Sequence, residues 1–493
     1  MPCFASSSVE YHFFPPGKKR SSGTGALLGE TSIGPSRGDD PFPELATATG
    51  GRMARTDDSQ RFGITRSRAR GGYGGRSLGI SKFLALGLVL IMGLLGVGPA
   101  YGAGFALYEF GARGTSMGGT MIGRADDPSA VAYNPAGITQ LEGTQTMVGF
   151  SLVMPEGDIE TPGDTTSIKS NTWIPPHAYV TRQMSDRIWL GLGVYNRFGL
   201  GTEFPDGWPG EYNNLFTRVK SLSFNPNLAY KLTDSVSVAV GAEVMWFDYY
   251  QKRMVGQALG GMRAELEGDS WGVGGNIALH YKPNDTWALG LTYKSRVKQT
   301  IKGDATFKRN PAAMALGYFN NTSAEGDLTL PDSFGLGVMF RPIERLSLEA
   351  NAIYTLWSTY DKLEITYGNA LTPGSPMGDN KVSSAQKNWN DVWRFQFGAE
   401  YDLTDLIKLR LGYVYDQIPD DDEYADYMTP TNDRNIITTG LGLAWDNLSL
   451  DFSYSYLWFG DRSIKGRPAD GVLDSTFKDG RTHLIGTSLS YRF

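Results

Sequence analysis

The sequence predicts an all-β fold, a 14-stranded antiparallel transmembrane β-barrel with an N-terminal hatch, or plug, inside the lumen. Three observations carry this prediction. Apolar and polar residues alternate over long runs, short and long connections alternate between these runs, and a Gly-rich segment that matches no strand precedes them. Strict alternation gives each strand one apolar and one polar face, which suits a wall between lipid and a polar lumen.

The first hundred residues indicate export and precede the folded part of the chain. Residues 83–97 form an uncharged apolar run of fifteen residues, which is shorter than the ~20 residues of a membrane-spanning helix. Basic residues precede the run and small residues follow it, as in a secretory signal peptide cleaved after Gly102. We therefore expect a disordered leader or a mis-assigned start at 1–76, with Met53 as a candidate start, and a signal peptide at 77–102. An uncleaved N-terminal membrane anchor is the alternative.

Composition and charge narrow the classes of function. The chain has 46 Lys and Arg against 52 Asp and Glu, so a basic surface for nucleic acid is not expected. The single cysteine, Cys3, allows no intramolecular disulfide and no Cys-x-x-Cys metal site, and the four histidines lack a nucleophile signature nearby. We therefore expect no catalytic residues, no metal and no cofactor. A general outer-membrane porin and an outer-membrane lipid hydrolase are the alternatives.

The alternation is clear in residues 235–246, where valines at even positions share one face and Ser235, Ser237 and Glu243 share the other. Such runs exceed the roughly five or six residues of an ordinary strand, and their apolar faces end in Tyr and Trp, as in the aromatic girdle of a membrane barrel. Backbone groups cannot stay unpaired in hydrocarbon, so the sheet must close. The barrel is expected over 144–493. Its predicted strands are 144–153, 174–182, 187–203, 218–230, 235–251, 271–281, 286–300, 328–340, 345–358, 393–401, 406–416, 434–445, 447–458 and 482–493.

Connections of two lengths separate the predicted strands. Six tight turns alternate with seven longer segments, at 154–173, 204–217, 252–270, 301–327, 359–392, 417–433 and 459–481. Short periplasmic turns and long external loops are the rule in bacterial outer-membrane barrels, so we expect this location, with both termini on the periplasmic side. The last strand ends in Phe493, which resembles the signal read by the outer-membrane insertion machinery. The expected partners are this machinery, lipopolysaccharide and other outer-membrane lipid, and the barrel is expected to be a monomer.

Residues 103–143 match no wall strand. They are rich in Gly and too polar to cross a membrane. The lumen of a fourteen-stranded barrel is wide enough to leak if nothing fills it. We therefore place this segment in the lumen as a hatch.

Several motifs follow one another in the hatch and beyond it. Ala103-Gly104-Phe105, Ala125-Asp126-Asp127 and Asn134-Pro135-Ala136 occur in this order, and further matches lie at 198–204, 225–230, 330–333 and 412–416. The ordered set, spread over 103–493, resembles the FadL/TodX family of outer-membrane transporters. The resemblance implies a hatch-plugged barrel that takes up hydrophobic compounds without energy input, either long-chain fatty acids or aliphatic and aromatic hydrocarbons. It also implies that the ligand leaves sideways through a kink in the third strand.

Two groups of residues are expected in the lumen. The substrate-binding pocket is expected at the start of the hatch, at Ala103, Gly104, Phe105 and Leu107, and at the lumen-facing charges Arg410 and Asp416, where a cation could pair with a fatty-acid carboxylate. The gate is expected where the hatch meets the kinked strand, at Asn134, Pro135, Ala136, Asn196, Phe198 and Gly199. Glycine within a strand often marks a bend, and Asn134 is expected to face the kink. The plainer interpretations are a structural ion network around Arg410 and an ordinary strand end with a local Asn-Pro turn.

A third group lies on two expected external loops. Val255, Leu259 and Met262 recur at helical spacing in the first loop, and Met314, Leu316 and Phe319 lie in the second. Apolar side chains are unusual on a solvated loop, and the resemblance implies a groove that captures the ligand outside. Packing of the two loops on each other is the alternative. The sequence leaves open whether the ligand is a fatty acid, an alkane or an arene.

Overall fold

The computed structural model of the protein describes residues 104–376 and 378–493. The expectations for the leader at 1–76, the signal peptide at 77–102 and the pocket residue Ala103 lie outside the described residues. They stay predictions.

The described chain forms one closed antiparallel β-barrel of fourteen wall strands, as the sequence predicts. The wall closes because β1 (Thr144–Thr161) pairs with β3 (Pro176–Gln183) on one side and with β21 (Ser475–Arg492) on the other. No helix in the described ranges has the length and hydropathy needed to cross a membrane.

Several wall strands consist of two segments in line. Between β3 and β21 the wall contains, in chain order, β4 (Ile188–Tyr195) with β5 (Gly199–Glu203), β6 (Phe216–Lys231), β7 (Val236–Val255), β8 (Met262–Tyr281), β9 (Trp287–Lys294) with β10 (Val297–Lys308), β11 (Thr322–Leu330) with β12 (Ser333–Ile343), β13 (Leu346–Thr355) with β14 (Lys362–Tyr367), β15 (Val382–Gln386) with β16 (Val392–Asp402), β17 (Ile407–Asp416), β18 (Arg434–Ala444) and β19 (Leu448–Phe459). Two short strands, β2 (Asp164–Ser167) and β20 (Arg462–Ile464), extend the external ends of β1 and β21.

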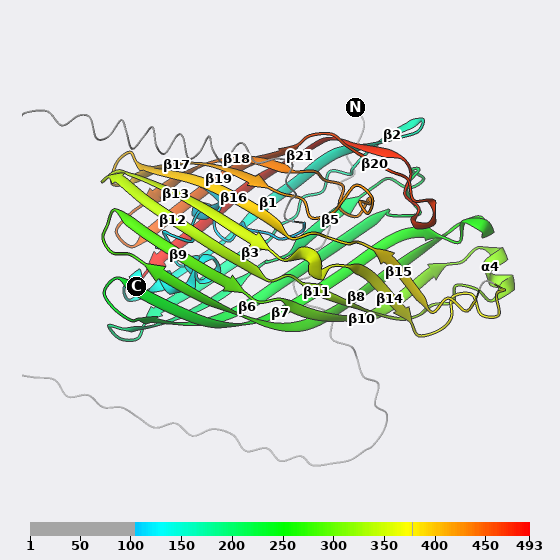
Figure 1. Cartoon of the computed structure of the whole chain (residues 1–493), viewed down its shortest axis with the longest axis horizontal. Helices are drawn as coiled ribbons and strands as arrows, with labels where there is room; N and C mark the ends of the chain where they lie inside the picture. The colour runs from blue at the N-terminus through cyan, green and yellow to red at the C-terminus, as the bar shows by residue number, and fades with distance from the viewer. Residues whose placement is uncertain (1–103, 377) are drawn as a thin grey trace, which may run out of the picture. The chain divides into compact units, whose positions relative to one another are not determined.

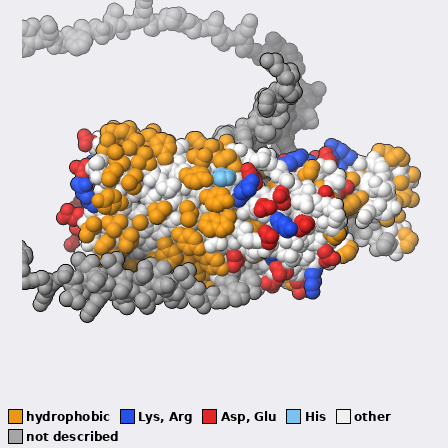
Figure 2. All heavy atoms as spheres, turned by 90° about the horizontal axis from the view of Figure 1, so that it is seen from above, with side chains coloured by type: hydrophobic (Ala, Val, Ile, Leu, Met, Phe, Trp, Pro, Cys, Tyr) orange, Lys and Arg blue, Asp and Glu red, His pale blue; other side chains and the backbone are white. Residues whose placement is uncertain are grey.

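The wall has an apolar outer face and a mostly polar or small inner face. On β7, Val240 and Val244 are 56% and 37% exposed, whereas the neighbouring Glu243 and Met245 point inward and are 2% and 0% exposed. Figure 2 shows the outward side chains as a broad hydrophobic band with charged side chains beyond both of its edges. In Figure 1 the short turns and the C-terminus lie at one end of the barrel, and the long hairpins with α4 (Pro311–Leu316) lie at the other.

The strands extend further outward than predicted. Large parts of the expected loops 154–173, 252–270, 301–327 and 459–481 are strand, because β1, β8, β10 and β21 continue their pairing past the hydrophobic band. On β8 the outward residues there are Glu265, Glu267 and Asp269, so the period of two continues without an apolar face. The helical spacing expected from Val255 to Met262 is therefore wrong. Only η2 (Gln257–Leu259) is helical, as one tight turn.

Residues 104–143 lie inside the ring of wall strands. They form α2 (Ala112–Ser116), α3 (Ala130–Tyr133) and the 3₁₀ segment η1 (Pro135–Gln140). Three different wall strands bind them. The backbone N–H of Ala112 donates to Ser488 Oγ on β21 (2.8 Å), Thr438 Oγ1 on β18 donates to the Ser116 carbonyl (2.9 Å), and His280 Nε2 on β8 lies 2.8 Å from the Gly123 carbonyl.

Inward glycines of the wall make room for this segment. A Cβ on Gly290 of β9 would lie 1.9 Å from the Ile122 carbonyl oxygen, and one on Gly398 of β16 would lie 2.0 Å from Thr120 Oγ1. Real Cβ atoms do not approach other atoms so closely, so any side chain at these positions would displace the hatch. The glycines therefore fix the depth at which the hatch backbone lies against the wall.

An aromatic cluster covers the external end of the barrel. Phe204 stacks on Trp208 with ring centroids 4.1 Å apart, and Tyr427 packs against Trp208 at 4.8 Å. Nearby, Arg462 binds Asp420 (3.2 Å), and burial raises the pKa of Asp420 to about 6 in spite of this cation. The external loops are therefore packed as a small core.

We expect the Phe204→Ala variant to lose about 3–5 kcal/mol of stability, because it leaves a cavity at a fully buried position. The measurement is the temperature at which the barrel loses its compact migration on a denaturing gel. Phe452→Ala, which removes a ring that is 43% exposed on the lipid face, is the matched control. Equal shifts for both variants would contradict the packed cap.

Candidate ligand pocket and gate

The third wall strand is broken, and the start of the hatch fills the break. β4 ends at Tyr195 and β5 begins at Gly199. Between them the N–H of Leu107 donates to the Arg197 carbonyl (2.9 Å), and the N–H of Gly199 donates to the Phe105 carbonyl (3.0 Å). The hatch therefore supplies the broken strand with backbone partners from within the lumen.

At the break, the third wall strand also loses its pairing with β3, its neighbour on the other side from β6. β3 pairs with β4 only up to Ala178 and Val194, and it has no pairing with β5. The indole of Trp173 lies where a side chain of Gly201 would point, 2.1 Å from the Cβ position. Glycine is thus required at 201, and Trp173 closes the wall beside the break.

Of the predicted gate residues, Asn196, Phe198 and Gly199 lie at this break. Asn134 does not face it, so that part of the expectation is wrong. The Asn134 amide nitrogen donates to the carbonyls of Ile122 (2.8 Å) and Leu279 of β8 (3.1 Å), and its oxygen accepts the N–H of Ala136 (3.1 Å). Asn134 caps η1 ahead of Pro135 and ties the hatch to β8, because its side chain points to the β8 side of the lumen.

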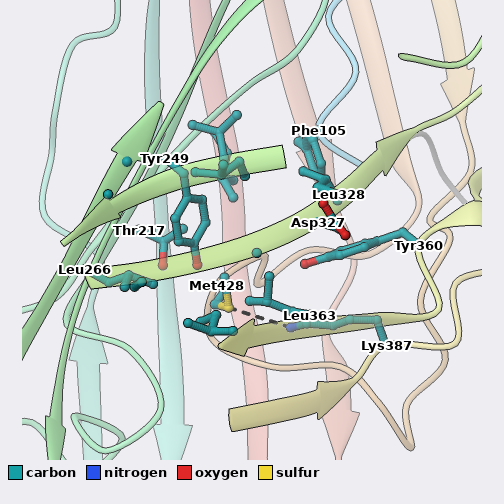
Figure 3. A pocket seen from close by; sticks show the side chains of 18 of the residues that line it. Phe105, Thr217, Tyr249, Leu266, Asp327, Leu328, Tyr360, Leu363, Lys387 and Met428 are labelled. Carbon is teal, nitrogen blue, oxygen red and sulfur yellow. Dashed lines mark hydrogen bonds between the residues drawn. The ribbon is translucent and has the colours of Figure 1, made fainter. Parts of the chain in front are cut away.

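An apolar cavity lies on the external side of Phe105 (Figure 3). The space between its lining residues is about 720 Å³, including its open end. Phe105 packs at its base against Trp357 (4.7 Å between ring centroids) and Trp389 (5.7 Å). The other apolar lining residues include Leu200, Val219, Leu266, Ile301, Ala324, Leu328, Tyr360, Leu363 and Ile365.

Several polar residues also line this cavity, among them Tyr249, Asp327 and Lys387. Tyr249 is 6% exposed, and its hydroxyl has no hydrogen-bond partner among the described residues. The ammonium of Lys387 is ion-paired with Asp426 and lies 3.6 Å from Met428 Sδ. Figure 3 shows these side chains around the same space. The cavity can therefore hold a long apolar chain with a polar end near Tyr249 and Lys387.

The lumen charges Arg410 and Asp416 lie away from this cavity. Arg410 binds Glu400 (2.7 Å) and Asp451 (2.6 Å), and Asp416 binds Arg394 (3.2 Å) and Arg434 (2.5 Å). The expectation that they line the pocket is wrong, because each is held in an ion network of the inner wall.

Glu400 of β16 anchors the hatch. It accepts hydrogen bonds from Arg113 (2.9 and 3.0 Å) and Arg124 (2.8 Å) of the hatch and from Arg410 of β17 (2.7 Å). Arg113 and Arg124 reach further carboxylates, at Asp126 and Glu349. Charge-assisted bonds in this number hold the hatch against one side of the wall.

The residues expected in an external groove separate into two sets. Met262 is 2% exposed and packs beneath the surface, whereas Met314 and Leu316 on α4 are 57% and 52% exposed. Val255 and Phe319 line an open cavity of about 1200 Å³ beside α4, and Leu259 lies in η2. In Figure 2 hydrophobic side chains also gather at the end of the barrel that carries α4 in Figure 1.

Sequence reasoning missed much of the main cavity. The sequence predicts a strand end at Trp357. It predicts loops, with no role in ligand binding, at Tyr360, Lys387, Trp389 and Met428. Their one visible signal is the density of aromatic residues at 357–360 and 389. Periodicity could not identify them, because they lie where strands break or loops fold inward.

His177, His280 and His483 lie on three different strands. His177 Nε2 is 2.8 Å from Ser488 Oγ, but this hydroxyl also accepts the N–H of Ala112. The pair therefore connects the hatch to the wall.

This geometry defines a class of protein: an outer-membrane β-barrel whose lumen is filled by its own N-terminal segment, with an apolar pocket on the external side. The solved structures agree on the fold. A FadL homologue from Pseudomonas aeruginosa is 18% identical, covers 79% of this chain and 99% of its own, and superposes with a TM-score of 0.70. The toluene transporter TodX from Pseudomonas putida is 17% identical, with 78% and 99% covered and a TM-score of 0.62.

Sequence comparison identifies the family. Residues 93–493 match the family described as outer membrane protein transport protein (OMPP1/FadL/TodX). The chain belongs to this family and is an outer-membrane transport protein. The long-chain fatty acid transport protein of Escherichia coli is 25% identical over 437 residues, which cover 80% of this chain and 95% of that protein.

We expect the Glu400→Gln variant to loosen the hatch, because it leaves the buried Arg124 and Arg410 and the partly buried Arg113 without their shared carboxylate. The expected loss is about 3–5 kcal/mol of stability, together with a larger ion conductance in planar bilayers. The control is Glu423→Gln, at an exposed loop position. If the variant has the same stability and the same ion conductance as the wild type, the network does not hold the hatch.

Proposed function

We propose that the protein takes up hydrophobic compounds across the outer membrane without energy input, with long-chain fatty acids as the first candidates and hydrocarbons as the second. One observation carries this proposal: a largely apolar cavity lies inside a barrel whose lumen is blocked by charged contacts on the periplasmic side. The names of its relatives, a long-chain fatty acid transport protein and a toluene transporter, support both ligand classes.

The proposed path begins at the external end. Met314 and Leu316 form an exposed apolar surface on α4. An apolar ligand that cannot cross the polar lipopolysaccharide layer can bind to this surface. The ligand then enters the main cavity, where burial contributes roughly 25 cal/mol per Å² of apolar surface. Phe105, at the base, connects ligand binding to the hatch.

The proposed exit is sideways. Among residues 104–143, two backbone hydrogen bonds, at Leu107 and Gly199, hold the broken third strand. A ligand that displaces Phe105 pulls on the same short segment, and this opens the wall beside Trp173 into the membrane. Such a ligand favours the open state to the extent that it binds that state more tightly.

The remaining expectations belong to this proposal. We propose that the chain is no enzyme, because its family is one of transporters, and that it is no general porin, because the hatch fills the lumen. The proposal also includes cleavage after Gly102 and insertion into the outer membrane through the signal at Phe493. It further includes contact of the outer rim with lipopolysaccharide and a monomeric barrel. The hatch is proposed as residues 103–143 and the barrel as 144–493.

We expect Val219→Trp to fill the main cavity and to weaken ligand binding at least about tenfold. Val219 is 5% exposed and lines the cavity. Binding would be followed by intrinsic fluorescence with hexadecanoic acid, its methyl ester, hexadecane and toluene. Val338→Trp, on the lipid-facing side of β12, is the control. If the wild-type protein binds none of the four ligands, the proposed function is wrong.

We expect a disulfide across the break to stop uptake and leave binding intact. Ala106 and Phe198 form an antiparallel bridge flanked by two hydrogen bonds, a pair with Cα atoms about 4.5 Å apart that suits a disulfide. The Ala106→Cys, Phe198→Cys variant, made with Cys3→Ser, should lose uptake about tenfold when oxidised and recover it when reduced. The single-cysteine variants are the controls. Full cross-linking with unchanged uptake would rule out exit at this site.

A further inference from the structure

A second cavity lies on the opposite side of Phe198 from the main one. It measures about 510 Å³, and its lining includes Leu107, Phe110, Phe198 and Ile353. Phe105, in the main cavity, and Phe198 lie with ring centroids 6.0 Å apart, so these two rings separate the cavities. Because Phe198 belongs to the break in the third strand, the second cavity borders the proposed exit.

Lys294 enters the second cavity from the end of β9. Its ammonium lies 4.7 Å from the centroid of the Phe110 ring and 5.5 Å from that of Tyr195. It forms no ion pair and no hydrogen bond with any residue that the structure describes. Aromatic faces attract a cation, but they offset only part of the cost of removing it from water.

The nearest carboxylates are already engaged. Glu243 accepts hydrogen bonds from Arg197 (2.8 Å) and Ser223 (2.6 Å). Arg197 lines the same cavity, but it also donates to the carbonyls of Ser295 (3.2 Å) and Pro331 (3.1 Å), so its guanidinium is already bonded to Glu243 and to the backbone. Lys294 is therefore left without a carboxylate partner in the second cavity.

A second carboxylate lies close along the chain. Asp332 accepts hydrogen bonds from Tyr293 of β9 (2.7 Å) and from Arg296, which lies between β9 and β10 (2.7 Å). It is thus no partner for the Lys294 ammonium. The hydroxyl residues Thr292 and Ser333 line the same cavity and add donors beside Lys294.

We propose that Lys294 binds the carboxylate of an amphiphilic ligand in this second cavity, between the main cavity and the break in the wall. The inference rests on the proposed function and specifies its ligand as an acid. In the main cavity the one lysine, Lys387, is paired with Asp426, and Asp327 and Glu325 line the same space, so an acid meets no free cation among the described residues there. At Lys294 it meets an amine without a carboxylate partner, with which it can form an ion pair, and this favours movement of the acid toward the break.

The test compares two ligands of equal chain length, hexadecanoic acid and hexadecane. Uptake is measured in bacteria that carry the full chain in the outer membrane and lack their own fatty acid uptake protein. Lys294→Met keeps an unbranched side chain one atom shorter and removes the amino group. We expect acid uptake to fall about tenfold and hexadecane uptake to stay unchanged. Lys282→Met, at the periplasmic turn after β8, is the control and should change neither.

Each outcome decides the inference. A selective loss of acid uptake in Lys294→Met, restored in Lys294→Arg, supports it. An unchanged ratio of acid to hexadecane overturns it, and so does an equal loss of both ligands in a barrel that still migrates compactly. If Lys294→Met does not fold, a folded Lys294→Arg that loses its preference for the acid also overturns it. Failure of the wild-type protein to take up either ligand counts against the proposed function instead.

Discussion

A strand within a membrane must have every backbone N–H and carbonyl bonded, and the third wall strand meets this requirement in an unusual way. Its wall neighbour β3 stops pairing at the break, so the hatch supplies the bonds at Leu107 and Gly199. The wall is therefore sealed from inside by a segment that can also respond to the lumen. Much else follows from this arrangement, including the position of Phe105 between the two cavities and the closure by Trp173.

The residues that line the lumen are charged around the hatch and mostly apolar around Phe105. Around the hatch, arginines and carboxylates bind one another and leave none of the charge at Glu400, Arg410 or Asp416 for a ligand. Around Phe105 the lining is aromatic and aliphatic, with Lys387 neutralised by Asp426. Strong ionic contacts thus keep most of the hatch still, and weak contacts at its first residues leave that end able to move.

The sequence predicted the features that the membrane imposes directly. The period of two in residues 235–246 and 407–416 marks wall strands, because one face of each must meet lipid. The same signal fades beyond the hydrophobic band, where Glu265 and Glu267 face outward, so the sequence predicts loops where the outer ends of the strands lie. The strand break at Asn196–Phe198 was visible because glycines follow it.

The pocket was harder to predict, because its residues meet only through tertiary structure. Lys387 and Met428 lie in long connections, and nothing in their local sequence indicates that these fold inward. The motif around Asn134 left a local turn ahead of Pro135 as the alternative to a contact with the kink, and nothing in it indicates the β8 carbonyl that the Asn134 amide also binds. Arg410 was assigned to the pocket on parity alone, and its partners Glu400 and Asp451 could not be read from spacing.

The pairing of β1 with β21 has a consequence for how the molecule is assembled. These strands are more than three hundred positions apart in the chain, as in the pairing of Val148 with Leu489, and they meet only when the last strand arrives. Until then the sheet has a free edge, Ser488 cannot hold the start of α2, and the hatch lacks part of its support. Contacts between such distant segments form late in folding. A partly assembled barrel therefore has neither a finished pocket nor a gate, so selective passage begins only with the completed ring.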